Sequence, residues 1–251
     1  MLSQLIMWIS IALELVLLVI GVRSRLAHRF PVFYGYIAFV MSQDLVSFFA
    51  LQSSGAVYKG VYWVTEFLGL VLGSLVVFEI YKVSLAAYPG AARMARNALA
   101  FVFLTALAKG LADATASPAV WLTASTALEI ERALRAVQAA AILALVALFL
   151  LYSIPFGRNL RGILLGYGFF VGERVICLAF VSQLTHDFWF YAYSASYLAA
   201  LSLWLGHLWS YDPTPQAKTS IQLEDEYLRI AAGTRRHFQE TRAYLRKAVR
   251  S

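Results

Sequence analysis

The stretch LEIERALRAVQ, residues 128–138, leads directly into AAAILALVALFLLYSI, residues 139–154, so that a segment with four charges adjoins a segment with none. Residues 133–154 match the length of roughly 20 mostly apolar residues that an α-helix needs to cross a bilayer. With a turn of about 100° per residue, Glu131, Arg135 and Gln138 lie on one face of this helix. We therefore predict a membrane helix that begins outside the hydrocarbon and carries polar side chains on its inner face into a bundle.

The whole chain has the composition of a polytopic membrane protein. It has 251 residues, of which 61% are hydrophobic and 14% charged, whereas in soluble domains about 25% are charged. Cys177 is the sole cysteine, which excludes an internal disulfide and a cysteine-based metal site. The first apolar segment contains Glu14 and has no basic residue before it, so we expect a retained helix and not a cleaved signal peptide.

Apolar segments of membrane-spanning length recur along the chain and predict an all-α protein. The seven predicted transmembrane helices are residues 2–22, 31–52, 61–83, 97–115, 133–154, 162–184 and 188–210. They form one predicted domain, residues 1–211, which is followed by a tail, residues 212–251.

The connections between these helices differ in basic charge. The first, third and fifth connections and their flanks carry Arg23, Arg25, Arg29, Lys82, Arg93, Arg96, Arg158 and Arg161. Outside the charged stretch 128–138, the alternate connections have only Lys59. Because basic connections stay in the cytoplasm, we predict an external N-terminus, a cytoplasmic C-terminus and a multi-pass protein of the cell membrane, which in a bacterium is the inner membrane.

The tail begins where Pro213 ends the last membrane helix, since proline cannot donate the backbone hydrogen bond. Thr219 and Gln222 have the spacing of a capping box, which predicts one amphipathic cytoplasmic helix from about residue 220. Its first turns are acidic and its end is basic, with a net positive charge. Anionic lipid headgroups or a cytoplasmic protein are the partners that fit such a helix. A solvated helix without a partner is the alternative.

Several ionisable residues lie within the predicted membrane helices. A charge at the bilayer centre costs about 2.5 kcal/mol or more, so such side chains turn toward the protein interior and toward partners. Those between mid-membrane and the external surface form the predicted ligand-binding set: Asp44, Glu66, Lys109, Arg135, Glu173 and Arg174. We expect them to line a water-accessible pocket. The alternative is a buried ion-pair network that fixes helix register and binds nothing.

Small residues indicate which helix faces pack closely. Gly162 and Gly166 share a face with Glu173, and Gly69 and Gly73 share a face with Glu66. Because small residues allow helices to approach in membranes, both glutamates are predicted to point at other helices.

Two ion pairs are expected from the depth of the charges. We expect Arg174 to pair with Asp44 or Glu66. We expect Glu173 to pair with Lys109 or Arg135.

A short motif occurs twice. Gly35-Tyr36-x-x-Phe39-Val40 is repeated as Gly166-Tyr167-x-x-Phe170-Val171, at an offset of 131 residues. The same offset of 131 residues aligns the first predicted helix with the fifth. This predicts that a unit of three helices is duplicated in parallel orientation, with the fourth helix as the linker. Chance is the alternative, because these residue types are common in membrane helices.

The sequence does not identify a reaction or a substrate. We find no catalytic motif, phosphate-binding loop or metal-ligand spacing, so an enzyme is the least favoured class, and neither a metal, a cofactor nor a nucleic-acid partner is predicted. A seven-helix receptor or sensor would bind an unknown small molecule in the external pocket and pass the change to the tail. A small transporter would move its substrate between two three-helix halves. An accessory subunit of a membrane complex would use the buried charges for structure alone.

Overall fold

The computed structural model describes residues 2–53, 55–115, 124–152, 157–180 and 186–212, together with Asp225, Leu228, Arg229 and Ala232. Throughout these residues every regular element is a helix and no strand occurs, which confirms the all-α class for the described chain. The helices are α1 Leu2–Arg23, α2 Leu26–Arg29, α3 Pro31–Ser53, α4 Gly55–Ser84, α5 Pro89–Thr115, α6 Ala124–Tyr152, α7 Arg158–Ala179 and α8 His186–Leu208. The predicted tail helix lies almost wholly outside the described residues.

The seven long helices coincide with the seven predicted segments, although their boundaries differ. α4, α5 and α6 begin at Gly55, Pro89 and Ala124, before the predicted starts at 61, 97 and 133. Apolar length marks only the part of a helix that lies in hydrocarbon, and a helix continues beyond it where its backbone remains hydrogen-bonded. The short α2 was not predicted. It follows Arg25, whose left-handed backbone (φ 60°) turns the chain between α1 and α3.

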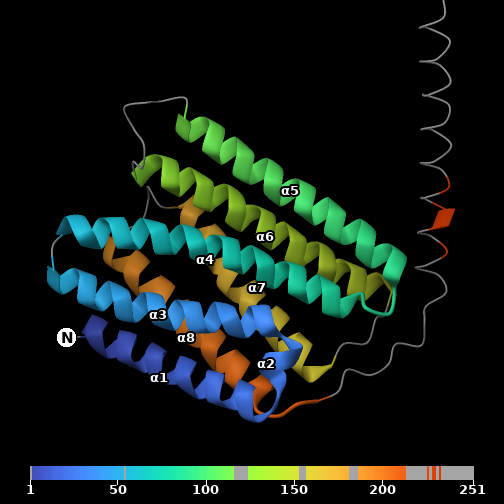
Figure 1. Ribbon diagram of the computed structural model, residues 1–251, viewed down its shortest axis with the longest axis horizontal. Coiled ribbons are helices and arrows are strands. Elements are labelled where there is room, and N and C mark those ends of the chain that lie inside the picture. Colours follow the sequence, from blue (N-terminus) through green and yellow to red (C-terminus); the bar gives the residue numbers. More distant parts are fainter. Residues whose placement is uncertain are drawn as a thin grey trace, which may run out of the picture.

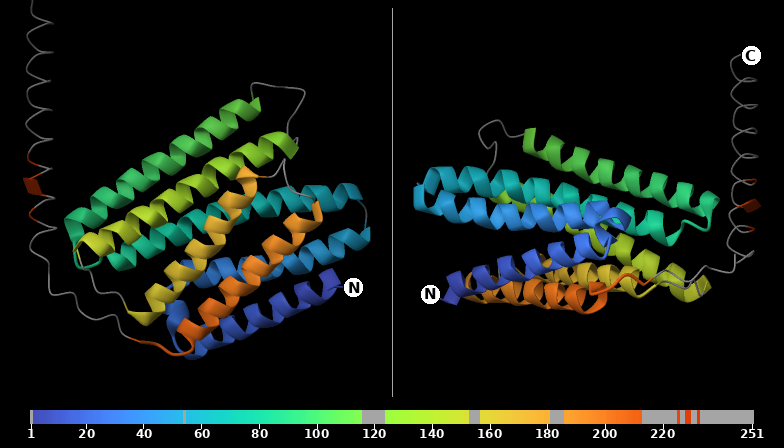
Figure 2. Two further views of the ribbon diagram at one scale, coloured as in Figure 1. Left: turned by 180° about the vertical axis from the view of Figure 1, so that it is seen from behind. Right: turned by 60° about the horizontal axis from the view of Figure 1, so that its bottom comes forward.

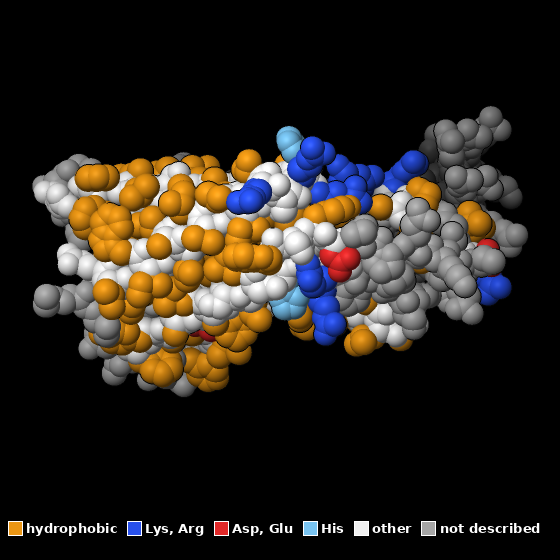
Figure 3. Space-filling view, turned by 90° about the horizontal axis from the view of Figure 1, so that it is seen from below, with side chains coloured by type: hydrophobic (Ala, Val, Ile, Leu, Met, Phe, Trp, Pro, Cys, Tyr) orange, Lys and Arg blue, Asp and Glu red, His pale blue; other side chains and the backbone are white. Residues whose placement is uncertain are grey.

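Within the described residues, six helices are long and apolar enough to cross a membrane: α1, α3, α4, α5, α6 and α7. Large apolar side chains also point away from the bundle, including Val22, Phe101, Leu150 and Leu151, which are 72% to 79% exposed. On the face of the molecule that Figure 3 shows, hydrophobic side chains cover one end, and a band of Lys and Arg side chains lies beside them. Such an outer surface suits lipid as the surrounding solvent. The bundle is therefore that of a multi-pass membrane protein.

Six of the helices form a closed ring. α1, α3, α4, α6, α7 and α8 each pack on the next in this order, and α8 packs back on α1. α5 lies outside the ring against α6 and α4, and it forms one edge of the bundle in Figures 1 and 2. The ring gives its six helices a shared interior, in which Phe33, Tyr167 and Trp204 are fully buried.

α7 packs on α8 through the predicted glycine face. A methyl group added at Gly166 would overlap the indole of Trp204, and one added at Gly162 would overlap the side chain of His207. In α4, Gly73 likewise leaves space for the hydroxyl of Tyr167. Side chains of other helices therefore pack closely on Gly162, Gly166 and Gly73, whereas the nearest atom to a carbon added at Gly69, in Phe39, is at an ordinary 3.7 Å.

One of the charges within the membrane helices caps another helix. Both carboxylate oxygens of Glu79 in α4 accept backbone hydrogen bonds at the start of α3, from the N–H of Val32 at 2.9 Å and of Phe33 at 2.8 Å. The first N–H groups of a helix have no partner within it, and in lipid each unsatisfied group is costly. Glu79 is thus explained by the fold and lies apart from the site.

Candidate functional site

Four buried side chains meet where α4, α6 and α7 pack together. We call them the ion-pair cluster: Glu66 of α4, Glu131 and Arg135 of α6, and Arg174 of α7. Their side chains are only 4% to 12% exposed. Burying a charge in such surroundings is costly unless an opposite charge lies beside it, and the cluster contains two carboxylates and two guanidiniums.

Each carboxylate of the ion-pair cluster contacts both guanidiniums. Glu131 Oε1 lies 2.9 Å from Arg174 Nη2 and 3.8 Å from Arg135 Nε. Glu66 Oε1 lies 3.4 Å from Arg174 Nη2 and 3.7 Å from Arg135 Nη2. The cluster has no net charge, and its ion pairs connect three helices that are distant in sequence.

Gln138 extends this network one turn further along α6. Arg135 Nη1 donates to Gln138 Oε1 at 3.4 Å. The amide nitrogen of Gln138 donates to Ser74 Oγ at 3.1 Å and to the Leu70 carbonyl at 3.2 Å, both in α4. The face of Glu131, Arg135 and Gln138 predicted from the sequence therefore points into the bundle, as expected.

Aromatic rings enclose the two guanidiniums. The guanidinium carbon of Arg174 lies 4.1 Å from the ring centroid of Tyr193, and that of Arg135 lies 5.3 Å from the centroid of Phe170. Cations over aromatic faces are stabilised by the ring quadrupole, most strongly when water is excluded. These contacts fix the orientation of both arginines relative to α7 and α8.

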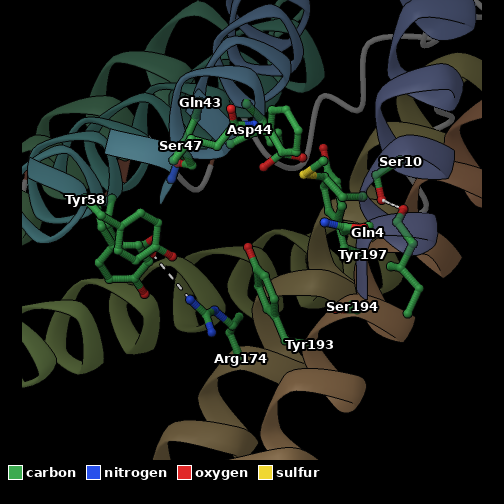
Figure 4. A pocket seen from close by; sticks show the side chains of 17 residues that line it. Gln4, Ser10, Gln43, Asp44, Ser47, Tyr58, Arg174, Tyr193, Ser194 and Tyr197 are labelled. Carbon is green, nitrogen blue, oxygen red and sulfur yellow. Dashed lines mark hydrogen bonds and ion pairs between the residues drawn. The ribbon is translucent and has the colours of Figure 1, made fainter. Parts of the chain in front are cut away.

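A cavity of about 670 Å³, which we call the polar cavity, opens next to the ion-pair cluster. Its walls come from the first part of α1, the second half of α3, the start of α4, the end of α7 and the first half of α8. In Figure 4, Gln43, Asp44 and Ser47 lie across the cavity from Arg174 and Tyr193. All of these segments lie at the same end of the bundle.

A smaller hollow of about 40 Å³ continues from the polar cavity toward Arg135. The two spaces share Gln43, Asp44, Glu66 and Tyr197 among their lining residues. The cavity thus reaches the cluster from two directions, through Arg174 in the larger space and through Arg135 in the smaller one.

The structure brings together four of the six predicted ligand-binding residues. Glu66, Arg135 and Arg174 belong to the ion-pair cluster, and Asp44 lines both spaces. The expected pair of Arg174 with Glu66 is confirmed. Lys109 lies in α5, outside the ring, with an exposed side chain.

Glu173 makes different contacts from those that the sequence suggests. Instead of Lys109 or Arg135, the Cys177 thiol donates to Glu173 Oε1 at 2.6 Å and the Ser196 hydroxyl donates to Oε2 at 2.9 Å. Arg174 is the next residue on the helix and points about 100° away, which is why one of these neighbours reaches the cluster and the other reaches α8.

The predicted ligand-binding set did not include Glu14, a buried carboxyl group near the cavity. Glu14 of α1 is fully buried, and the Tyr197 hydroxyl donates to its Oε1 at 2.5 Å. Tyr197 itself lines the polar cavity. The two residues are 183 positions apart in the chain, so only the packing of α1 against α8 makes them partners.

In the part of the chain that the structure describes, no three His, Cys, Asp or Glu side chains are grouped in a way that could hold a metal ion. The sequence matches no protein-family model, no curated protein and no solved structure. The fold and the site nevertheless define a class: a helical multi-pass membrane protein with a polar cavity at one end of the bundle, next to a buried cluster of ion pairs.

Proposed function

We propose that this protein is a membrane receptor or sensor that binds a small molecule in the polar cavity. The observation that carries the proposal is that the cavity reaches Glu66 and Arg174, whose ion pairs join α4, α6 and α7. A ligand that contacts either side chain competes with those ion pairs. Binding then favours a different packing of the three helices, because a ligand shifts a conformational equilibrium by its difference in affinity for the two states.

The distribution of basic residues between the two ends of the bundle supports a cavity that faces the outside of the cell. The basic residues Arg23, Lys82, Arg93 and Arg158 lie at the ends of α1 and α4 and the starts of α5 and α7, which is the end of the bundle opposite the cavity. With basic connections in the cytoplasm, seven spanning helices place the cavity outside and Tyr211 inside. The tail then lies in the cytoplasm, next to anionic lipid or a partner protein, and the protein resides in the cell membrane.

Labelling of introduced cysteines tests this orientation. In a Cys177→Ser background, Gln52→Cys at the cavity end should react with a membrane-impermeant maleimide in intact cells. Ala87→Cys, between α4 and α5, should react only after permeabilisation. Both side chains are exposed, so a difference in labelling reports the side of the membrane. The opposite pattern would place the cavity in the cytoplasm.

The same experiment determines whether α8 crosses the membrane. It has 23 residues but is not among the six helices that are apolar enough by composition. Phe188→Cys should behave like Gln52→Cys, and Tyr211→Cys like Ala87→Cys. Labelling of both positions from one side would contradict a seventh span.

Ligand binding is tested by thermal stabilisation of the purified protein against a library of small polar molecules, followed by native mass spectrometry of the hits. Arg174→Gln removes a positive charge from the cavity wall and should change the affinity of a true cavity ligand by about tenfold or more, which corresponds to about 1.4 kcal/mol: weaker for an anion and tighter for a cation. Arg161→Gln, an exposed position on the same helix, is the matched control and should leave binding unchanged. If no compound binds and Arg174→Gln only lowers stability, the cluster serves structure alone, as in an accessory subunit.

A small transporter is a second candidate, which the packing of the ring favours. The order α1, α3, α4 is repeated by α6, α7, α8, and the two junctions between these halves, α4 with α6 and α8 with α1, are equivalent. The rings of Tyr36 and Tyr167, equivalent residues of the repeated motif, contact each other with centroids 5.9 Å apart. Both points support two parallel halves around one interior. Uptake of the identified ligand into proteoliposomes would favour transport, whereas binding without uptake favours a sensor.

A further inference from the structure

We propose that the ligand of the polar cavity is an organic cation, whose ammonium group pairs with Asp44. The inference rests on the proposed function, because it assigns a chemical class to the ligand of the same cavity. It follows from the balance of charge around the cavity, from the position of Asp44 and from the aromatic walls.

The charge balance of the cavity wall is negative. Glu66 and Arg174 both line the cavity, but both are already neutralised within the ion-pair cluster, each by two partners of opposite charge. An anionic ligand would have to displace a carboxylate from Arg174. Among the lining residues that the structure describes, the remaining charged one is Asp44. The cavity wall therefore has one carboxylate in excess.

Asp44 has no such neutralisation. Among the residues that the structure describes, no Lys, Arg or His makes an ion pair with its carboxylate. It is partly buried in the second half of α3, where it lines both the polar cavity and the smaller hollow. A carboxylate at this depth loses part of its hydration without a counter-ion. A bound cation restores the missing interaction.

The neighbourhood of Asp44 holds acidic and aromatic groups. Tyr197, which lines the cavity with Asp44, donates its hydroxyl to the buried Glu14. The phenol of Tyr197 is therefore already committed to a carboxyl group on α1. The rings of Tyr58 and Tyr62, stacked with centroids 6.3 Å apart, form another wall of the same cavity.

These walls suit an ammonium group that carries an organic substituent. Aromatic faces attract cations and also accept apolar groups, while the hydroxyl and amide side chains of Ser47 and Gln43 supply hydrogen-bonding positions near Asp44. At about 670 Å³ the cavity is in the size range of small-molecule sites and far larger than a single inorganic ion requires. Charge, surface and volume point to the same class of ligand.

Three probes with one shared skeleton test the inference: phenethylammonium, phenethyl alcohol and hydrocinnamate, which are positive, neutral and negative at neutral pH. Binding to the purified full-length protein is measured by isothermal titration calorimetry. The ammonium probe should bind about tenfold or more tightly than the alcohol, a difference in binding free energy of about 1.4 kcal/mol or more. Hydrocinnamate should bind most weakly. Asp44→Asn should reduce the difference between ammonium and alcohol to about twofold or less, an amount expected without an ion pair.

Two further variants separate the ligand charge from folding. Asp44→Glu keeps the carboxylate and should retain most of the preference for the cation. Ser42→Ala changes an exposed serine of the same helix, outside the cavity lining, and should leave the preference unchanged. The thermal unfolding temperature of each variant without ligand shows whether the bundle is intact.

Several results would overturn the inference. Equal binding of ammonium and alcohol, a preference that survives in Asp44→Asn, or failure of the ammonium probe to bind would each do so. Tighter binding of hydrocinnamate, lost in Arg174→Gln, would also overturn it and yet support the proposed function, because the cavity would then recognise an anion through Arg174. Library compounds that bind the cavity but carry no positive charge would likewise overturn the inference and support the proposed function.

Discussion

Replacing Arg135 by Met is expected to lower the free energy of unfolding by about 3 to 5 kcal/mol, the cost of breaking a buried ion pair by removing one partner. The Arg135 side chain is 4% exposed and contacts both Glu66 and Glu131. Without it, Glu66 and Glu131, whose side chains are only 12% and 8% exposed, share the single guanidinium of Arg174. Unfolding of the purified protein by heat and by sodium dodecyl sulfate in mixed micelles measures the loss.

Two controls separate this effect from loss of charge in general. Arg161→Met removes an exposed arginine from α7 and should change the stability by less than about 0.5 kcal/mol. Adding Glu131→Gln to Arg135→Met should recover part of the loss, because it removes the uncompensated carboxylate and directly interacting residues are not additive. If the two losses simply add, the ion pairs of the cluster do not interact as the distances indicate.

The second large effect is expected at the crossing of α7 and α8. Gly166→Ala should destabilise the protein by about 1 to 3 kcal/mol, the usual cost of inserting a methyl group into a well-packed core. The added carbon would overlap the indole of Trp204, which is fully buried and donates from Nε1 to the Ile163 carbonyl at 3.4 Å. Trp204 also packs edge-on against Phe33 at 5.1 Å between centroids, so the indole has little space into which to move.

The chain provides matched glycines for this test. Gly172, on the same helix, and Gly35, the equivalent of Gly166 in the repeated motif, have no heavy atom within 4 Å of an added Cβ. Alanine at either position should be neutral or stabilise by up to about 1 kcal/mol, because alanine favours the helix over glycine. A similar loss of stability for all three variants would mean that helix backbone effects, and not the overlap with Trp204, explain the result at Gly166.

Hydropathy located the long helices because the energetic requirement for a membrane helix is local. A run of about 20 apolar residues is visible in the sequence without knowledge of the neighbours. The inward direction of Arg135 and Gln138 was also predictable, because a charged or amide group facing lipid is too costly and helical geometry then fixes which other side chains share its face. The same reasoning predicted Asp44 or Glu66 as the partner of Arg174, and the structure has Glu66.

The positions of Lys109 and Glu173 in the structure differ from those expected. Lys109 was assigned to the pocket from its depth alone, but α5 packs outside the ring and carries it away from the cavity. Hydropathy gives the depth of a residue in the membrane. It does not give the order of the helices around the bundle, which decides whether a residue at that depth faces the cavity. Glu173 is satisfied by Ser196 and Cys177, neutral partners that a search for opposite charges overlooks.

By itself the sequence determined the helices, the unequal distribution of basic residues along the chain and the inner face of α6, because each depends on the cost of placing one residue or one turn in lipid. The tertiary structure alone decided that Glu66 and not Asp44 pairs with Arg174, where the cavity lies and that Tyr197 meets Glu14. Those features depend on the order in which helices close the ring, and that order results from packing summed over many side chains that are distant in sequence.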